Sequence, residues 1–424
     1  VLFKFANAVW LSLAALGAYL VARTRLGWTP ALAAAAAASG SLAIVVLLVT
    51  GVVLSEPMFM ALLFPALLLS ERAAETGSVR TAALAGLACG ALALVRTLGA
   101  VAIPAAVLVL VMRRHWRAAI ALALAASLCL VPWQLWVNAW QHEIPPVLLG
   151  KYGAYGPWLG QALSEGGGAF VRDVAIANAR SIERFLSYVF MPLTNSWARG
   201  ATSVVVVVLL AAGLASLVRR SIVTALFLGA YAAVVLAWPF EPERFVLAVW
   251  PLIMLCAFAG GALVLAWRPK GRVTVSARYL AIALSCAVAA GFVVFNGRGY
   301  SRQWWASVQR DVGQRAKPTA EWVAAETRPS DVLMTDDDLL VYLYTGRRGM
   351  PTSTFSPWER LRTPTDAENI AAVRVMIDTY RPRYYITTSQ PGQRAAEALT
   401  KGDRPLLRRY RLLSNAFIYE RTSP

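Results

Sequence analysis

Long apolar runs separated by short basic connections constrain this chain more than any other feature. A membrane-spanning helix needs about 20 apolar residues, and runs of roughly that length recur up to residue 296. The composition agrees, since 58% of the 424 residues are hydrophobic and the mean hydropathy is +0.54, well above the values of a water-soluble domain. We therefore predict an α-helical polytopic membrane protein with about ten transmembrane helices. The predicted spans are residues 5–22, 31–48, 53–70, 81–95, 97–112, 117–138, 201–218, 221–238, 245–267 and 277–295.

Two of these divisions depend on polar interruptions. Residues 81–112 are too long for one crossing at about 1.5 Å per residue, and Arg96 interrupts them near the middle. We expect a tight hairpin with Arg96 at its tip. Residues 31–70 divide at, or a few residues before, the sequence SEP around Glu56. Serine is a good N-cap and proline suits the first turn of a helix, so Ser55 is expected to cap the helix that follows.

The basic residues predict an orientation. If the spans alternate, one set of short connections holds 13 Lys and Arg residues, whereas the other holds only Lys4, Arg96 and Arg244. By the positive-inside rule the first set is cytoplasmic. We therefore expect a multi-pass protein of the cytoplasmic (inner) membrane whose residues after about 296 are extracytoplasmic. The acidic residues predicted on that outer side are Glu56, Glu143, Glu165, Asp173, Glu183, Glu241 and Glu243.

The net charge of +18 does not require a nucleic-acid partner. Residues 1–296 hold 21 Lys and Arg against 9 Asp and Glu, so much of the excess lies between apolar segments, where loop orientation explains it. The four cysteines lie in apolar runs without the spacing of a metal or redox site, and we interpret them as packing residues. His115 and His142 are far apart in sequence. We expect no nucleic-acid binding and no zinc site.

Two regions differ from the apolar helices. Residues 139–200 form a long outer loop that ends in FVRDVAIANARSIERFLSYVF, which has the amphipathic pattern of an interfacial helix. Residues 297–424 alternate short helical and strand-like runs, which is typical of a small α/β domain. Within this domain, the acidic run 336–338 either binds a cation or marks a strand end followed by a helix start. We favour the second interpretation.

Several segments together resemble a known family. These are KFANAVWLSLAALGAYLVAR, VVLSEPMFMALLFPALLLSER, ALALVRTLGAVAIPAAVLVLV, VPWQLWVNAW, ERFVLAVWPLIML and DDLLVYLYTGRR. In order and spacing they resemble GT-C glycosyltransferases of the family 39 and aminoarabinose-transferase kind. The resemblance implies transfer of a sugar from a polyprenyl-phosphate carrier to a lipid, glycan or protein acceptor at the outer face of the membrane. Neither the donor sugar nor the acceptor follows from these residues.

The family's acidic pair, expected in its first outer loop, does not occur in this sequence. If the first residues correspond to a later helix of the family, that loop lies upstream of Val1. The resemblance then leaves the catalytic residues unassigned, with the general base expected upstream, and a product beginning at Val1 is expected to be inactive.

The chemistry of sugar transfer directs attention to the outer charged residues. A carboxylate must accept a proton from the acceptor, and cationic groups must stabilise the departing phosphate. Arg96 and Arg244 are candidates for phosphate binding, and the alternative is that they anchor helices at the interface. Glu56 is a candidate ligand for a divalent metal ion or sugar hydroxyls, and it can instead orient Arg96 or cap its helix. No other cofactor is expected.

The remaining candidates lie in two outer segments. Glu241 and Glu243 have either a site or a structural role, and one of them is expected to pair with Arg244. Lys151 and Tyr152, in GKYGAYGPW, are candidates for contact with carrier phosphate or sugar, and the alternative is an aromatic interfacial loop in contact with membrane lipid.

Two other classes of function stay open at this point. A transporter or flippase of a lipid-linked substrate predicts internal repeats, broken helices and charges at mid-membrane. A membrane scaffold with an outer binding domain is the third alternative. The sequence shows no internal repeat and its charges gather on one side, so we favour the enzyme, with an outer cavity lined by Glu56, Arg96, Lys151 and Arg244.

Overall fold

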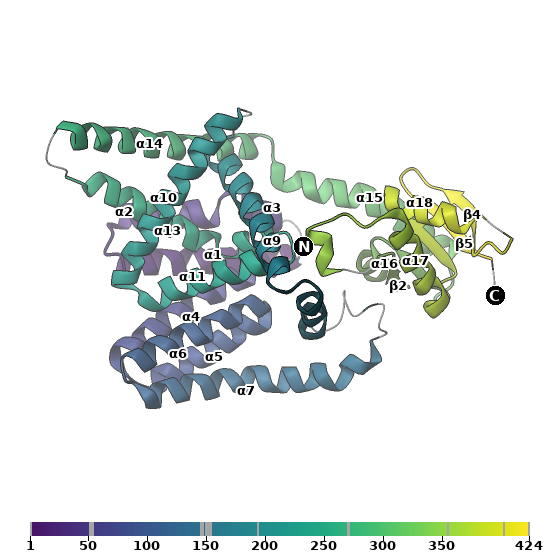
Figure 1. Cartoon of the computed structure of the whole chain (residues 1–424), viewed down its shortest axis with the longest axis horizontal. Coiled ribbons are helices and arrows are strands. Elements are labelled where there is room, and N and C mark those ends of the chain that lie inside the picture. The colour runs from purple at the N-terminus through teal and green to yellow at the C-terminus, as the bar shows by residue number, and fades with distance from the viewer. Residues whose placement is uncertain are drawn as a thin grey trace. The chain divides into compact units, whose positions relative to one another are not determined.

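The chain divides into two compact units. One comprises Val1–Trp136 and Arg172–Ala306, and the other comprises Val137–Val171 and Ser307–Pro424. Part of the predicted outer loop 139–200 therefore belongs with the C-terminal unit. The structure is a computed structural model (Figure 1). It describes residues 2–50, 55–144, 148, 155–192, 195–268, 272–353, 356–401 and 403–422.

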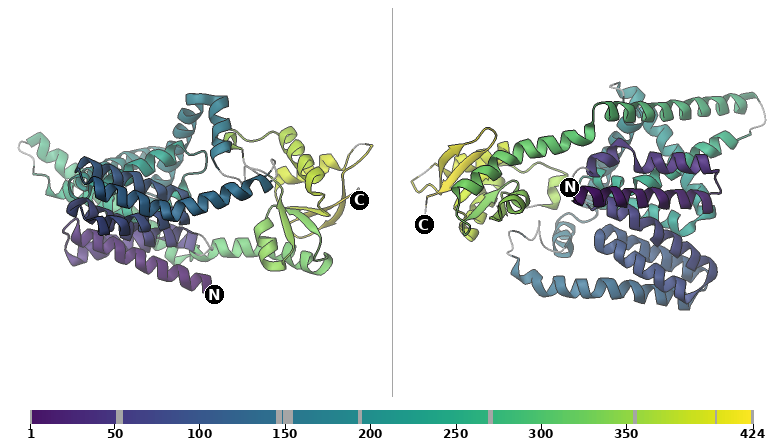
Figure 2. Two further views of the ribbon diagram at one scale, coloured as in Figure 1. Left: turned by 90° about the horizontal axis from the view of Figure 1, so that it is seen from below. Right: turned by 180° about the vertical axis from the view of Figure 1, so that it is seen from behind.

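The N-terminal unit is built from helices, and α4, α5 and α6 lie side by side within it (Figures 1 and 2). Its elements are α1 (Leu2–Thr24), α2 (Pro30–Ser41), α3 (Ile44–Thr50), α4 (Glu56–Thr76), α5 (Val79–Val95), η1 (Thr97–Val101), α6 (Ala102–Met112), α7 (Trp116–Trp140), the second half of α9 (Tyr155–Phe190), α10 (Ser196–Arg220), α11 (Ile222–Ala237), α12 (Glu243–Ala248), α13 (Trp250–Ala266) and α14 (Arg272–Ser301).

Each predicted span contains a helix or a pair of helices, but length and hydropathy support fewer crossings than ten. Five of the described helices are long and apolar enough to cross a membrane, and α2 with α3, bent by 47° at a short break, would make a sixth. The helices α5, α11 and α13 are apolar but shorter, as is the run from η1 through α6. The structure thus shows a helical unit of the membrane type, and the number of ten crossings stays a prediction.

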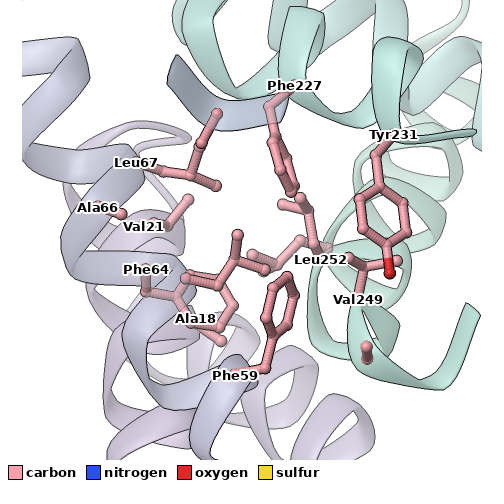
Figure 3. Close-up of a cluster of buried hydrophobic side chains, with 14 of the residues drawn as sticks. Ala18, Val21, Phe59, Phe64, Ala66, Leu67, Phe227, Tyr231, Val249 and Leu252 are labelled. Carbon is pink, nitrogen blue, oxygen red and sulfur yellow. The ribbon is translucent and has the colours of Figure 1, made fainter. Parts of the chain in front are cut away.

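Large apolar side chains of α4 form the centre of this unit. Phe59, Phe64 and Leu67 are fully or almost fully buried, and they share one apolar cluster with Phe227 and Tyr231 of α11, in which the Phe59 and Tyr231 ring centroids are 6.4 Å apart (Figure 3). Within a membrane, where lipid is as apolar as these side chains, close packing holds the helices together. Helix α4 is therefore held on several sides, which fixes the position of its first residue.

Small residues let neighbouring helices approach closely. A Cβ atom on Gly213 of α10 would lie 1.9 Å from the carbonyl oxygen of Cys256 in α13, and one on Gly260 of α13 would lie 2.0 Å from that of Leu209 in α10. Such contacts between backbones are the usual way in which membrane helices pack when they carry glycine at the interface. The pair α10 and α13 therefore depends on glycine at both positions.

The amphipathic segment predicted near residues 170–190 is helical, as part of α9. The backbone of α9 is interrupted at Gly167, where φ is 53° and ψ is −145°. In its second half, the Asn178 side-chain amide nitrogen lies 3.0, 3.1 and 2.7 Å from the carbonyl oxygens of Val235, Leu236 and Trp238, so its two N–H groups are shared among three acceptors. The amide thus links α9 to the C-terminal end of α11, where the Val235 and Trp238 carbonyl oxygens also accept from backbone N–H groups.

The C-terminal unit contains a five-stranded sheet in the order β2-β1-β3-β5-β4. Strand β1 is parallel to β2 and β3, whereas β5 is antiparallel to β3 and β4. Strands β4 and β5 are yellow in Figure 2. The predicted small α/β fold is confirmed for this unit. Its elements are η2 (Gln141–Glu143), the first half of α9, α15 (Trp304–Glu326), β1 (Val332–Thr335), α16 (Asp338–Thr345), β2 (Arg348–Pro351), η4 (Pro357–Arg360), α17 (Asp366–Tyr380), β3 (Tyr384–Thr387), α18 (Gln390–Leu399), β4 (Leu407–Leu412) and β5 (Phe417–Arg421).

The acidic run 336–338 lies where β1 ends and α16 begins. Strand β1 ends at Thr335, Asp337 is the residue before α16, and Asp338 is in its first turn. The predicted strand end and helix start are therefore confirmed. The first acid, Asp336, belongs to neither element.

Candidate functional site

Glu56 is the first residue of α4 and is completely buried. Pro57 occupies the first turn, as predicted, because its fixed φ and missing N–H suit that position. The prediction that Ser55 caps the helix through its side chain is wrong, because its hydroxyl makes no capping hydrogen bond. The Ser55 hydroxyl instead accepts a hydrogen bond from Arg96 Nη1 at 3.4 Å.

Arg96 lies in the break between α5 and η1. Its backbone is extended, with φ −149° and ψ 127°, so the helix is interrupted at the residue that the sequence indicates. The Arg96 side chain is only 10% exposed, and its Nη1 lies 2.7 Å from Glu56 Oε1. The predicted contact between Glu56 and Arg96 is therefore present.

Arg244 approaches the same carboxylate oxygen from α12. Its Nε and Nη2 donate hydrogen bonds to Glu56 Oε1 at 3.1 and 3.0 Å. Unlike Arg96, the Arg244 side chain is 58% exposed. The expectation that Arg244 pairs with Glu241 or Glu243 is wrong, because the start of α12 packs against α4, where Glu56 is the acid within reach of the guanidinium.

The three residues carry a net positive charge. One carboxylate faces two guanidinium groups, and all the hydrogen bonds that it accepts from them go to Oε1. Guanidinium stays protonated at every physiological pH, so the cluster has a formal surplus of one positive charge when Glu56 is ionised. A surplus guanidinium that is partly exposed, as Arg244 is, can hold an anionic group through parallel N–H bonds.

Two carboxylate oxygens of this region have no described partner. Glu56 Oε2 and Glu243 Oε2 are buried, and neither has a hydrogen-bond partner among the residues that the structure describes. A buried acceptor without a partner costs about 1–3 kcal/mol.

Two aromatic residues outside the predicted candidates support the cluster. The Arg96 guanidinium carbon lies 5.3 Å from the centre of the Phe245 ring, within the range of a cation–π contact. The Tyr231 hydroxyl donates to the Phe245 carbonyl oxygen at 2.9 Å, and the same tyrosine borders the core in Figure 3. A tyrosine within the apolar helix 221–238 was the available signal, because a buried hydroxyl requires a partner.

The other candidates do not join this cluster in the described structure. Glu241 is exposed, and Glu243 is half-buried in the first turn of α12. Lys151 and Tyr152 lie outside the described residues, so their predicted contact with substrate stays a prediction.

A divalent cation does not fit the acidic residues that the structure describes. No group of three His, Cys, Asp or Glu side chains lies together among them. At Glu56 a cation would also compete with two guanidinium groups for the same carboxylate. We derive no step through a metal ion.

Comparison with known proteins gives this site no family. No protein-family model matches the sequence, and no curated protein matches it.

Proposed function

We propose that this protein transfers a sugar from a polyprenyl-phosphate carrier to a lipid, glycan or protein acceptor, at the outer face of the cytoplasmic membrane. The observation that carries the proposal is the arrangement of Arg96 and Arg244 on one oxygen of the buried Glu56. Two guanidinium groups facing one carboxylate leave a surplus positive charge, which can bind a phosphate group. The family resemblance of the sequence supports the same chemistry.

The two arginines have different tasks in this proposal. Arg96 is nearly buried and is held by Glu56, Ser55 and the Phe245 ring, so it supplies a fixed positive charge. Arg244 is more than half exposed, so its outward N–H groups bind the carrier phosphate. As the bond between the anomeric carbon and the phosphate oxygen breaks, negative charge grows on the phosphate, and fixed cationic groups stabilise it without reorganising.

Glu56 is a positioning residue in this proposal. Its carboxylate fixes both guanidinium groups. Because Glu56 and Arg96 are buried or nearly buried, the interaction between these two is stronger than it would be in water. The proposal also includes the location: the cytoplasmic membrane, with the site on its outer side and the C-terminal unit outside the cytoplasm. This location rests on the distribution of basic residues.

The proposal is tested in lipid vesicles with the product of the gene extended upstream of Val1, so that the general base expected there is included. The assay uses a panel of radiolabelled polyprenyl-phosphate sugars, with envelope lipids and glycans as acceptors. Arg244→Ala should abolish transfer while insertion into the membrane is unchanged. Arg180→Ala is the matched control, because Arg180 is exposed on α9 and lies outside the cluster, and it should leave transfer intact. Turnover retained by Arg244→Ala would assign this arginine to interfacial anchoring.

One observation favours a second candidate, a carrier of lipid-linked substrates. The bend of 47° between α2 and α3 is a broken span of the kind that transporters use. The break is nevertheless supported by α14, because Asn296 Oδ1 accepts from the Ile44 N–H at 2.7 Å and the Tyr300 hydroxyl donates to the Leu42 carbonyl oxygen at 2.5 Å. If the protein moves a fluorescent polyprenyl phosphate across the vesicle bilayer without transferring any sugar, its function is transport of lipid-linked substrates.

A further inference from the structure

The C-terminal unit contains a cavity at the carboxyl ends of its parallel strands. The cavity encloses about 510 Å³, which is within the range of small-molecule sites. Strand β1 lies between β2 and β3. The connection after β1 leads to β2 on one side, and the connection after β2 leads to β3 on the opposite side of β1. In open α/β sheets the crevice at such a reversal is where ligands bind.

Asp336 fixes the floor of this cavity. Its Oδ2 accepts hydrogen bonds from the backbone N–H groups of Thr388 at 2.8 Å and Ser389 at 3.0 Å, and from the Thr387 hydroxyl at 2.9 Å. The Thr352 hydroxyl donates to the other oxygen of Asp336. One carboxylate thus joins the ends of β1, β2 and β3 to the start of α18. It also occupies the place at that helix N-terminus where an anionic ligand would otherwise bind.

The charges of the lining nearly cancel. Arg362 donates to both carboxylate oxygens of Glu368 at 2.8 Å, and Arg394 Nε donates to Asp366 at 3.1 Å. The lining contains three carboxylates and two guanidinium groups, namely those of Asp336, Glu359, Glu368, Arg362 and Arg394. An anion would face three carboxylates and a cation would face two guanidinium groups. The ligand that matches this lining is therefore neutral.

The rest of the lining offers hydrogen-bond donors and acceptors next to an aromatic ring. The Ser353 and Thr363 hydroxyls and the Asn369 amide can each donate and accept. Trp358 also lines the cavity, and its indole is held in place, because Nε1 donates to Glu165 at 3.0 Å and the ring packs edge-on against Phe170 at 4.8 Å between centroids. A fixed ring costs little entropy when a ligand packs on it.

We propose that this cavity binds a neutral polyhydroxylated molecule, a mono- or disaccharide. Sugar hydroxyls donate and accept at once, so they match paired arginine and carboxylate groups as well as hydroxyl and amide groups. The C–H face of a sugar ring packs on an indole. This binding site does not depend on the transfer chemistry proposed above, because all its residues belong to the C-terminal unit.

Two adjacent alanines of α17 provide a matched pair of variants. Ala372 lines the cavity, whereas Ala371 is exposed and lies outside the lining. Ala372→Trp fills the cavity, and Ala371→Trp adds the same side chain to the outer surface. A third variant, Asn369→Ala, removes one polar group of the lining without adding volume, so it tests the site even if Ala372→Trp does not fold.

The experiment measures saturation transfer to free sugars by NMR, with the full chain in lipid nanodiscs so that no glycoside detergent competes. The probes are mannose, glucose, N-acetylglucosamine and maltose, with glucose 6-phosphate as the charged counterpart. We expect a saturation-transfer signal, which reports binding, from at least one neutral sugar for the natural sequence and for Ala371→Trp. Ala372→Trp should weaken that binding by about tenfold or more, and Asn369→Ala by a few-fold. The proposal would be overturned by any of three results: no saturation-transfer signal from any neutral sugar, binding of the phosphorylated sugar alone, or equal binding by all variants.

Discussion

Arg244 Nη2 lies 3.0 Å from Glu56 Oε1, although 188 residues separate the two in sequence. The contact joins the start of α12 to the start of α4. Because Arg96 binds the same oxygen, three helix ends meet at a single carboxylate. Removing the acid and removing either arginine should therefore have different effects on stability.

We predict that Glu56→Ala destabilises the protein far more than Arg244→Ala. Loss of Glu56 leaves the nearly buried Arg96 without its carboxylate, and breaking a buried pair costs about 3–5 kcal/mol. Arg244 is more than half exposed, and Glu56 keeps Arg96 when Arg244 is lost, so that change should cost about 1 kcal/mol or less. Heat-induced unfolding in detergent measures both, in a background in which the half-buried Cys129 and the exposed Cys286 are replaced by alanine. A thiol dye then reports exposure of the buried Cys89 and Cys256. Equal losses for the two variants would contradict the separate roles.

Much of the fold follows from patterns within short segments. The apolar runs predicted where helices lie, and Arg96 indicated a helix break, because a charged residue inside an apolar run requires a local change of surroundings. The alternation of short runs after residue 297 predicted a small α/β domain, which the sheet and its helices confirm. The number of membrane crossings was harder to predict from the sequence. An apolar helix of 16 or 17 residues, such as α11 or α13, has the composition of a membrane-spanning helix but is shorter than a full span.

The candidate site was predictable as a set of residues but not as a set of contacts. Glu56, Arg96 and Arg244 are charged residues beside apolar runs, and this contrast is visible in sequence. The partner of Arg244 depends on how α12 packs against α4, which is a tertiary property. Glu243 lies next to Arg244 in sequence, but adjacent residues on a helix do not face each other.

Adjacent glycines of α13 provide a test of helix packing. Gly260→Ala should destabilise the protein by about 1–3 kcal/mol, because its Cβ would lie 2.0 Å from the Leu209 carbonyl oxygen and the helices must separate to accept it. Gly261 has nothing within 4 Å of the same position, so Gly261→Ala should be neutral or stabilise by up to about 1 kcal/mol through helix propensity. The same unfolding measurement applies. A loss for Gly261→Ala equal to that for Gly260→Ala would contradict this packing of α10 and α13.

Two acids near the end of α4 should differ in the same assay. Glu71 is buried and accepts hydrogen bonds from the Thr224 N–H at 2.9 Å and the Thr224 hydroxyl at 3.0 Å, at the start of α11. Glu71→Ala leaves these donors without an acceptor, which should cost about 1–3 kcal/mol. Glu75, which pairs with Arg25, is 47% exposed, so Glu75→Ala should cost about 1 kcal/mol or less. The reverse order would show that Glu71 does not hold α11.

The start of α17 should lose stability in acid. Hydrogen bonds from Arg362, and from the backbone and hydroxyl of Thr365, lower the pKa of Glu368 from 4.5 to about 2. A lowered folded-state pKa means that the ionised carboxylate favours folding above about pH 4.5, and that this contribution disappears as the pH falls towards 2. Hydrogen exchange of α17 amides in the full chain should therefore be slower in the natural sequence than in Glu368→Gln at neutral pH. The difference should vanish towards pH 2, and a difference that persists there would exclude Glu368 titration as its cause.

The proposed orientation can be tested by labelling from one side. In a background without the native cysteines, Glu143→Cys, after α7, should react with a membrane-impermeant thiol reagent added to intact cells. His115→Cys, before α7, should react only after the cells are opened, because the positive-inside rule places Arg113, Arg114 and Arg117 in the cytoplasm. Both positions lie among the described residues at opposite ends of one candidate span. If position 115 reacts in intact cells and position 143 is protected, the orientation is the reverse of the one proposed. Sugar transfer at the outer face of the membrane is then excluded.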